Sequence, residues 1–161
     1  MATPSCDDRF ITSRSTGGIM SRLAVIDVQL CVGCQLCMMA CVRRQNEVGL
    51  ASSCIGIRSA GGMEHGFTVV VCRACADPPC ARSCPVDALR VRKGGGVLLD
   101  KKKCIGCKTC VQNCILGAIF WDPDQGKPMI CIHCGQCVPF CPYGVLGMEK
   151  KTKVTGVKAT A

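Results

Sequence analysis

Apolar residues occur in short runs, and each run borders a stretch rich in cysteine. The run "LAVIDVQ" (Leu23–Gln29) predicts a strand before the first cysteine stretch, and "GFTVVV" (Gly66–Val71) predicts a strand that enters the second. Two longer segments predict hairpins, Leu89–Asp100 turning at Gly94–Gly96 and Ala118–Ile130 turning near Asp122–Gly126. No run approaches the ~18 apolar residues of a membrane span.

The cysteines form four near-copies of one pattern, which we call runs one to four. Run one is "CVGCQLCMMAC", run two "CRACADPPCARSC", run three "CIGCKTCVQNC" and run four "CIHCGQCVPFC". Run two carries a two-residue insertion that contains Pro78 and Pro79, and proline stiffens such a loop. Short helical turns are expected after Cys84, Cys114 and Cys141. Together the elements predict an α+β fold of duplicated, ferredoxin-like two-cluster modules with short strands and short helices.

The spacing C-x2-C-x2-C-x3-C is typical of [4Fe–4S] ligation, in which the fourth cysteine of a run binds the other cluster of a two-cluster module. Structural zinc uses two C-x2-C pairs and does not need a third cysteine three residues on, so zinc is disfavoured. Four runs predict four [4Fe–4S] clusters, with iron bound by sixteen cysteines: Cys31, Cys34, Cys37, Cys41, Cys72, Cys75, Cys80, Cys84, Cys104, Cys107, Cys110, Cys114, Cys131, Cys134, Cys137 and Cys141.

Composition and charge are consistent with this interpretation. Hydrophobic residues make up 48% of the 161 residues, but eighteen of them are cysteines and six are aromatic, so the carbon core is thin. The first residues have no apolar signal segment, which predicts a reducing, cytoplasmic location. The net charge is +9. Four oxidised clusters with their thiolates carry about −8, so the basic residues balance buried anions, and nucleic-acid binding is not expected.

The order of the runs, regular, stretched, regular, regular, resembles the four-cluster electron-transfer subunits of molybdenum and tungsten oxidoreductases, of the dimethyl-sulfoxide reductase iron–sulfur subunit type. The motifs "CRACADPPCARSCPVDAL" and "CIHCGQCVPFCPYGVL" carry the resemblance, which covers Leu23–Lys150. The short chain is most similar to the small subunit of tungsten-dependent aldehyde oxidoreductase. The small subunits of benzoyl-CoA reductase and of formate dehydrogenase or hydrogenase complexes are alternatives.

The resemblance implies that runs one and four exchange ligands, and that runs two and three do the same. It implies four ligand sets: Cys31, Cys34, Cys37 and Cys141; Cys131, Cys134, Cys137 and Cys41; Cys72, Cys75, Cys80 and Cys114; Cys104, Cys107, Cys110 and Cys84. Spacing alone also permits run one with run two and run three with run four. The long gap from Cys41 to Cys72 argues against that alternative.

This pairing divides the chain into four parts. Residues 1–20 form an N-terminal extension, residues 21–50 and 129–150 form module A, residues 51–128 form module B, and residues 151–161 form a C-terminal tail. The two polar ends have too little apolar content to fold alone, so they are expected to order only on a neighbour.

Two cysteines and two histidines lie outside the predicted ligands. Cys6 and Cys54 belong to no run and are expected to be plain thiols. His133, inside run four, is either a hydrogen-bond donor to a cluster sulfur or a packing residue, because all four cysteines of its run are present. His65 is expected to be ordinary surface, or else a partner contact.

The sequence contains no catalytic site. It has no nucleotide loop of the G-x-G-x-x-G type and no P-loop. The segment Lys101–Lys103 is interpreted as a solvated face, as a counter-charge for the neighbouring cluster, or as a docking site for an acidic subunit. The pair Phe120–Trp121 is interpreted as part of the core or as an anchor at a protein interface.

The chain is therefore predicted to move electrons and to leave the chemistry to other subunits. The expected partners are a large catalytic subunit with a tungsten or molybdenum pterin, and a flavin (FAD) subunit that reduces NAD, or a ferredoxin. The resemblance also implies that further copies of this chain are partners, stacked on one another in a filament. The alternative is a free polyferredoxin.

Overall fold

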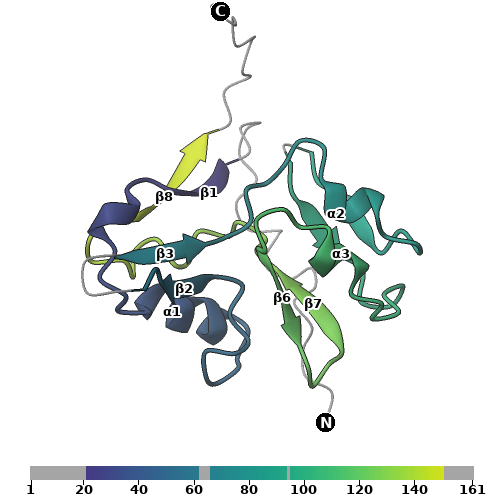
Figure 1. The fold of residues 1–161 in the computed structure, drawn as a ribbon, viewed down its shortest axis with the longest axis horizontal. Coiled ribbons are helices and arrows are strands. Elements are labelled where there is room, and N and C mark those ends of the chain that lie inside the picture. Colours follow the sequence, from purple (N-terminus) through teal and green to yellow (C-terminus); the bar gives the residue numbers. More distant parts are fainter. Residues whose placement is uncertain (1–20, 62–65, 94, 151–161) are drawn as a thin grey trace, which may run out of the picture.

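The computed structural model describes residues 21–61, 66–93 and 95–150, and the fold of these residues consists of short antiparallel strands and a few short helices (Figure 1). The predictions for residues 1–20, 151–161, Cys6, His65 and Gly94 lie outside the described residues. The elements in chain order are β1 (Ser21–Val25), η1 (Val28–Leu30), α1 (Leu36–Arg44), β2 (Gly56–Ser59), β3 (Phe67–Val70), α2 (Pro79–Arg82), β4 (Leu89–Val91), β5 (Val97–Leu99), α3 (Thr109–Gln112), β6 (Ile119–Asp122), β7 (Lys127–Ile130) and β8 (Leu146–Lys150).

Strands β1 and β8 join the two ends of the described chain. They pair antiparallel from Ser21 opposite Lys150 to Val25 opposite Leu146. Arg22 donates two hydrogen bonds to Glu149 across the pair, and the Nη2–Oε2 distance is 3.0 Å. This pairing brings the start of run one beside the end of run four, although the two runs are far apart in sequence.

Both predicted hairpins are confirmed. Strand β4 pairs with β5 and β6 pairs with β7, in each case antiparallel. The first hairpin closes with a hydrogen bond from Arg92 N to Gly96 O, and Gly95 and Gly96 have φ of 101° and 78°, which side chains disfavour. The strand predicted from Gly66–Val71 is also confirmed, as β3.

Two local predictions need correction. The strand expected over Leu23–Gln29 ends at Val25, because Asp27 accepts a hydrogen bond from Gln29 N and caps the 3-10 turn η1. The helical turns expected after Cys84, Cys114 and Cys141 are wrong. Short helices instead precede the first two of these cysteines, and each of the three is followed by a single turn closed by a hydrogen bond between its carbonyl and the amide three residues on.

The apolar residues form two cores. The first contains Leu23, Ile55, Val71, Met129 and Leu146 together with the thiols of Cys37, Cys54, Cys131 and Cys137. The second contains Ala81, Leu89, Val97, Ile119 and Ile130 with Cys80 and Cys110. Figure 1 shows the corresponding halves, with α1, β1, β2, β3 and β8 on one side and α2 and α3 on the other. The β6–β7 hairpin contributes to both cores.

Candidate iron–sulfur centres

Fifteen of the sixteen cysteines of the four runs line four cavities, and each cavity combines two runs. One is lined by Cys31, Cys34, Cys37 and Cys141. A second, of about 430 Å³, is lined by Cys72, Cys75, Cys80 and Cys114. A third is lined by Cys84, Cys104, Cys107 and Cys110. Runs one and four therefore meet, and so do runs two and three.

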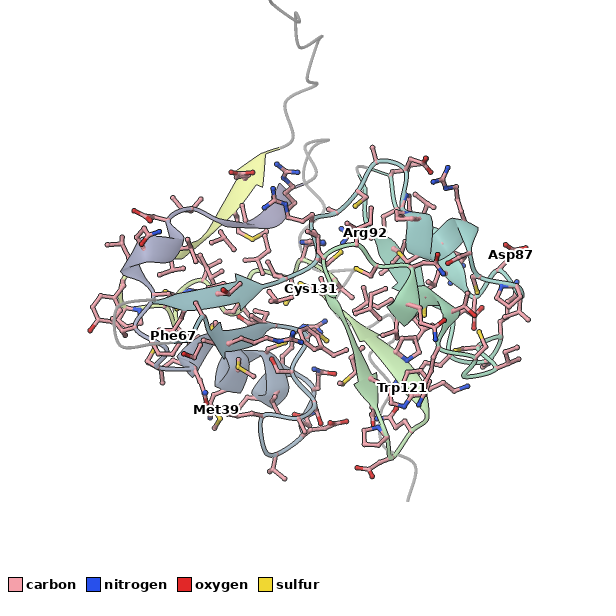
Figure 2. The ribbon with its side chains drawn as sticks, in the orientation of Figure 1. Met39, Phe67, Asp87, Arg92, Trp121 and Cys131 are labelled. Carbon is pink, nitrogen blue, oxygen red and sulfur yellow. The ribbon has the colours of Figure 1, made fainter. Side chains whose placement is uncertain are left out.

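The remaining four cysteines of the runs are Cys41, Cys131, Cys134 and Cys137. Cys41, Cys131 and Cys134 line the fourth cavity together with Cys54. Cys137 belongs to the same buried core as Cys131, and it interacts electrostatically with Cys131, Cys134 and Cys41. Figure 2 shows Cys131 between the two halves of the fold. Each set thus offers four thiols, the donor chemistry that a cubane cluster requires.

The four runs share a backbone conformation that the cysteine spacing does not reveal. The residue before the second cysteine has a left-handed conformation in every run, with φ of 71° at Gly33, 50° at Ala74, 74° at Gly106 and 58° at His133. This conformation reverses the chain between two ligands. It is easy for glycine and costs about 1–2 kcal/mol for other residues.

Backbone amides donate to the sulfur of the fourth cysteine in each run. Ala88 N lies 3.3 Å from Cys84 Sγ, Ala118 N lies 3.3 Å from Cys114 Sγ, and Val145 N lies 3.3 Å from Cys141 Sγ. In each of these three cases the donor is four residues after the cysteine. Hydrogen bonds to cluster sulfurs stabilise the more negative, reduced state, so these amides are suited to the ligands of a cluster that accepts electrons.

Run one departs from this rule and recruits Cys54 instead. Helix α1 continues through Cys41 to Arg44, so the amide four residues after Cys41, that of Gln45, donates to Val42 O at the end of the helix. Cys54 N donates to Cys41 Sγ instead, at 3.4 Å. A side-chain hydrogen bond from Cys54 lowers the pKa of Cys41 to about 6. Gln45 Nε2 lies 3.9 Å from Cys54 Sγ. Cys54 was predicted to be a plain thiol, and no spacing signal indicated this contact.

Burial raises the pKa of several predicted ligands, to about 11 for Cys37 and Cys80 and about 12 for Cys137. Burial raises the pKa of Cys131 even more than that of Cys137. These thiols hold their protons at neutral pH when no iron is bound, so cluster assembly must release protons.

Cys107 lies at the surface, where Thr109 Oγ1 donates to its sulfur at 3.3 Å and lowers its pKa. Lys108 stacks over Trp121, with Nζ 4.8 Å from the ring centroid, and Trp121 lines the same cavity as Cys107. Of the lysine cluster, Lys102 and Lys103 are exposed, and Lys101 donates to Gln125.

We predict that Gly33→Ala destabilises the folded protein more than Gly49→Ala. Both glycines have positive φ, 71° and 80°, so both variants carry a similar backbone penalty. A Cβ at Gly33 would lie 2.4 Å from the Phe67 ring, whereas one at Gly49 meets nothing within 4 Å. Crowding of this kind costs about 1–3 kcal/mol.

The measurement is the thermal midpoint of the anaerobic, iron-loaded protein, followed by visible absorbance. We expect Gly33→Ala to lower it by several degrees more than Gly49→Ala. Equal midpoints for the two variants would show that Phe67 does not pack against run one.

Comparisons with known proteins agree with this site. A family model described as a 4Fe–4S dicluster domain matches residues 63–139, and one described as a 4Fe–4S binding domain matches residues 29–42. The putative electron transport protein YsaA of Escherichia coli is 32% identical over 84% of this chain and 94% of its own length.

Two further relatives carry names of reductase components. A tetrathionate reductase subunit of Archaeoglobus fulgidus is 35% identical over 71% of this chain, and the chain spans 56% of that protein. A putative dimethyl sulfoxide reductase iron–sulfur subunit of Halobacterium salinarum is 30% identical over 65% of this chain and 47% of its own length. The chain thus spans about half the length of these two relatives.

Proposed function

The chain belongs to the family of 4Fe–4S electron-transport proteins, and from this premise we propose that it binds four [4Fe–4S] clusters and relays single electrons within an oxidoreductase complex. Relatives named as subunits of reductases and as electron transport proteins support a non-catalytic, electron-carrying role. No helix in the part of the chain described by the structure is long and apolar enough to cross a membrane.

The observation that carries the proposal is the grouping of thiols at the four cavities. We assign Cys31, Cys34, Cys37 and Cys141 to centre I, and Cys41, Cys131, Cys134 and Cys137 to centre II. Centre III takes Cys72, Cys75, Cys80 and Cys114, and centre IV takes Cys84, Cys104, Cys107 and Cys110. Bound clusters would supply one-electron chemistry, and the chain holds them in fixed relative positions. Centres I and II would form module A, and centres III and IV module B, as a duplicated ferredoxin-like fold.

Electrostatic interactions between thiols and the packing of Cys72 support a linear order of the centres from I to IV. Cys37 of centre I acts electrostatically on Cys137 of centre II. Cys72 of centre III acts on Cys131 of centre II and packs against both apolar cores. Centres I and IV are then the ends of the row. Every centre has one exposed cysteine, Cys34, Cys134, Cys75 and Cys107 in order from I to IV, so the end positions rest on the thiol interactions and not on exposure.

The partner we propose is a large tungsten or molybdenum catalytic subunit, most specifically of the aldehyde oxidoreductase type. The electron acceptor is a flavin subunit or a ferredoxin, and stacked copies of the chain would lengthen the row. The second candidate is a free cytoplasmic polyferredoxin. It is favoured by YsaA, the relative whose length this chain nearly matches, because it is named as an electron transport protein and not as a subunit.

The test is anaerobic purification of the native protein with analysis of iron, acid-labile sulfide, tungsten, molybdenum and flavin. We expect about 16 iron atoms and 16 sulfides per chain, four of each per cluster. A large chain with bound tungsten or molybdenum should co-purify in fixed ratio. A reproducible value near 8 iron atoms would contradict the four-cluster assignment, and elution as a lone chain would favour the free carrier.

A further inference from the structure

The side chain of His133 is buried at the boundary between centres II and III with one nitrogen unsatisfied. It is 6% exposed. Leu23 N donates to Nδ1 at 3.1 Å, so the neutral imidazole carries its proton on Nε2. Nε2 is fully buried and has no hydrogen-bond partner among the described residues. Leaving a buried donor unpaired costs about 1–3 kcal/mol, so the position calls for an acceptor.

The backbone at His133 is also strained, as it is at Ala74, the corresponding residue of run two. His133 has φ of 58° at a position that two of the other runs fill with glycine, Gly33 and Gly106. A residue with a side chain there is strained by about 1–2 kcal/mol. Ala74 keeps the same strain without a donor, so the feature particular to His133 is the buried, unpaired Nε2–H, which is accounted for if it has a function.

The surroundings of Nε2 belong to centre III. A Cβ built on Gly96 would lie 3.5 Å from Nε2 and 3.6 Å from Ala74 Cβ. Gly96 lines the cavity of Cys72, Cys75, Cys80 and Cys114, and Gly96 N donates to Cys75 O at 3.0 Å. Ala74 lies between Cys72 and Cys75 and is itself buried.

The other end of the residue belongs to centre II. His133 N donates to Cys131 Sγ at 3.4 Å. Arg92 also lies at the boundary between centres II and III. Its Nη1 donates to Ile132 O at 2.6 Å, and its positive charge interacts with both His133 and Cys72. Figure 2 shows Arg92 close to Cys131, between the two halves.

We propose that His133 bridges centres II and III, donating its backbone amide to the Cys131 sulfur and its Nε2–H to a sulfur of centre III. The inference rests on the proposed function. His133 is a positioning residue, since it ligates no iron. Its Nε2–H stabilises the reduced state of centre III and so raises that centre's reduction potential, favouring electron transfer across the boundary between modules.

The experiment compares His133→Phe, His133→Gly and His133→Gln in the iron-loaded protein. Phenylalanine keeps the ring volume and removes the donor, glycine removes the donor and the backbone strain, and glutamine keeps an N–H donor at similar reach. Reduction potentials come from titrations monitored by EPR. The exposed ligand variant Cys75→Ser, made in the same backgrounds, marks the signal of centre III.

We expect the phenylalanine and glycine variants to lower the potential of the marked centre and to leave the other three unchanged, with glutamine restoring most of the shift. Pulsed EPR supplies a second readout. The chain has two histidines, so ¹⁵N-histidine in a His65→Gln background should show one nitrogen coupled to centre III. Unchanged potentials at full iron content, or a shift confined to another centre, would overturn the proposal. Iron content and wild-type EPR signals test the clusters separately.

Discussion

Removing iron from the anaerobically purified protein should abolish its cooperative unfolding transition and its native secondary structure together. The two apolar cores are small, and among the described residues the largest fully buried side chains are Ile55, Val42 and Val97. Buried thiols supply part of both cores. Without clusters these cores lose the iron that links their cysteines, so the free energy of metal binding becomes the free energy of folding.

Charge acts in the same direction. The chain carries a net charge of +9, which four bound clusters would reduce to near zero. Iron removal therefore adds self-repulsion to the loss of the cross-links. The measurement is circular dichroism and a thermal scan before and after chelation under oxidising conditions, with return of iron and sulfide as the control. A cooperative transition in the iron-free chain would contradict the prediction.

The cysteine pattern and the hairpins could be predicted from sequence because both are local signals. The turns at Gly95–Gly96 and Asp122–Gly126 lie within a few residues of the strands they join. Strand β8 was missed because its partner β1 lies at the other end of the described chain. Strand β2 was missed because "GIRS" is short and half polar, and its pairing with β3 stabilises it.

Helix α1 carried a signal that could have revealed it. The segment "LCMMACVRR" contains good helix formers and ends with Arg43 and Arg44, whose charges favour a helix C-terminus. His133 shows the opposite limit, because sequence left it as either a sulfur donor or a packing residue. Only the fold brings it beside Gly96 and Ala74 and leaves Nε2 without a partner among the described residues.

The exchange of ligands between runs gives the second large effect, expected in paired cysteine variants. In our assignment Cys141 belongs with Cys34 in centre I, while Cys107 belongs to centre IV. Under the alternative pairing of run three with run four, Cys141 would share a cluster with Cys107. Cys34 and Cys107 are both exposed, so replacing either by alanine disturbs packing little and the two variants are matched.

The prediction is that Cys34→Ala adds no further iron loss to Cys141→Ala, whereas Cys107→Ala does. Loss of centre I alone leaves about 12 iron atoms per chain, and loss of centres I and IV leaves about 8. If an empty centre I also unfolds module A, each count falls further, but the Cys34 double variant still matches the Cys141 single variant. The readouts are iron and acid-labile sulfide per chain, with EPR of the reduced protein. If Cys141→Ala with Cys107→Ala retains as much iron as Cys141→Ala alone, runs three and four share a cluster and the assignment of centres I and IV is wrong.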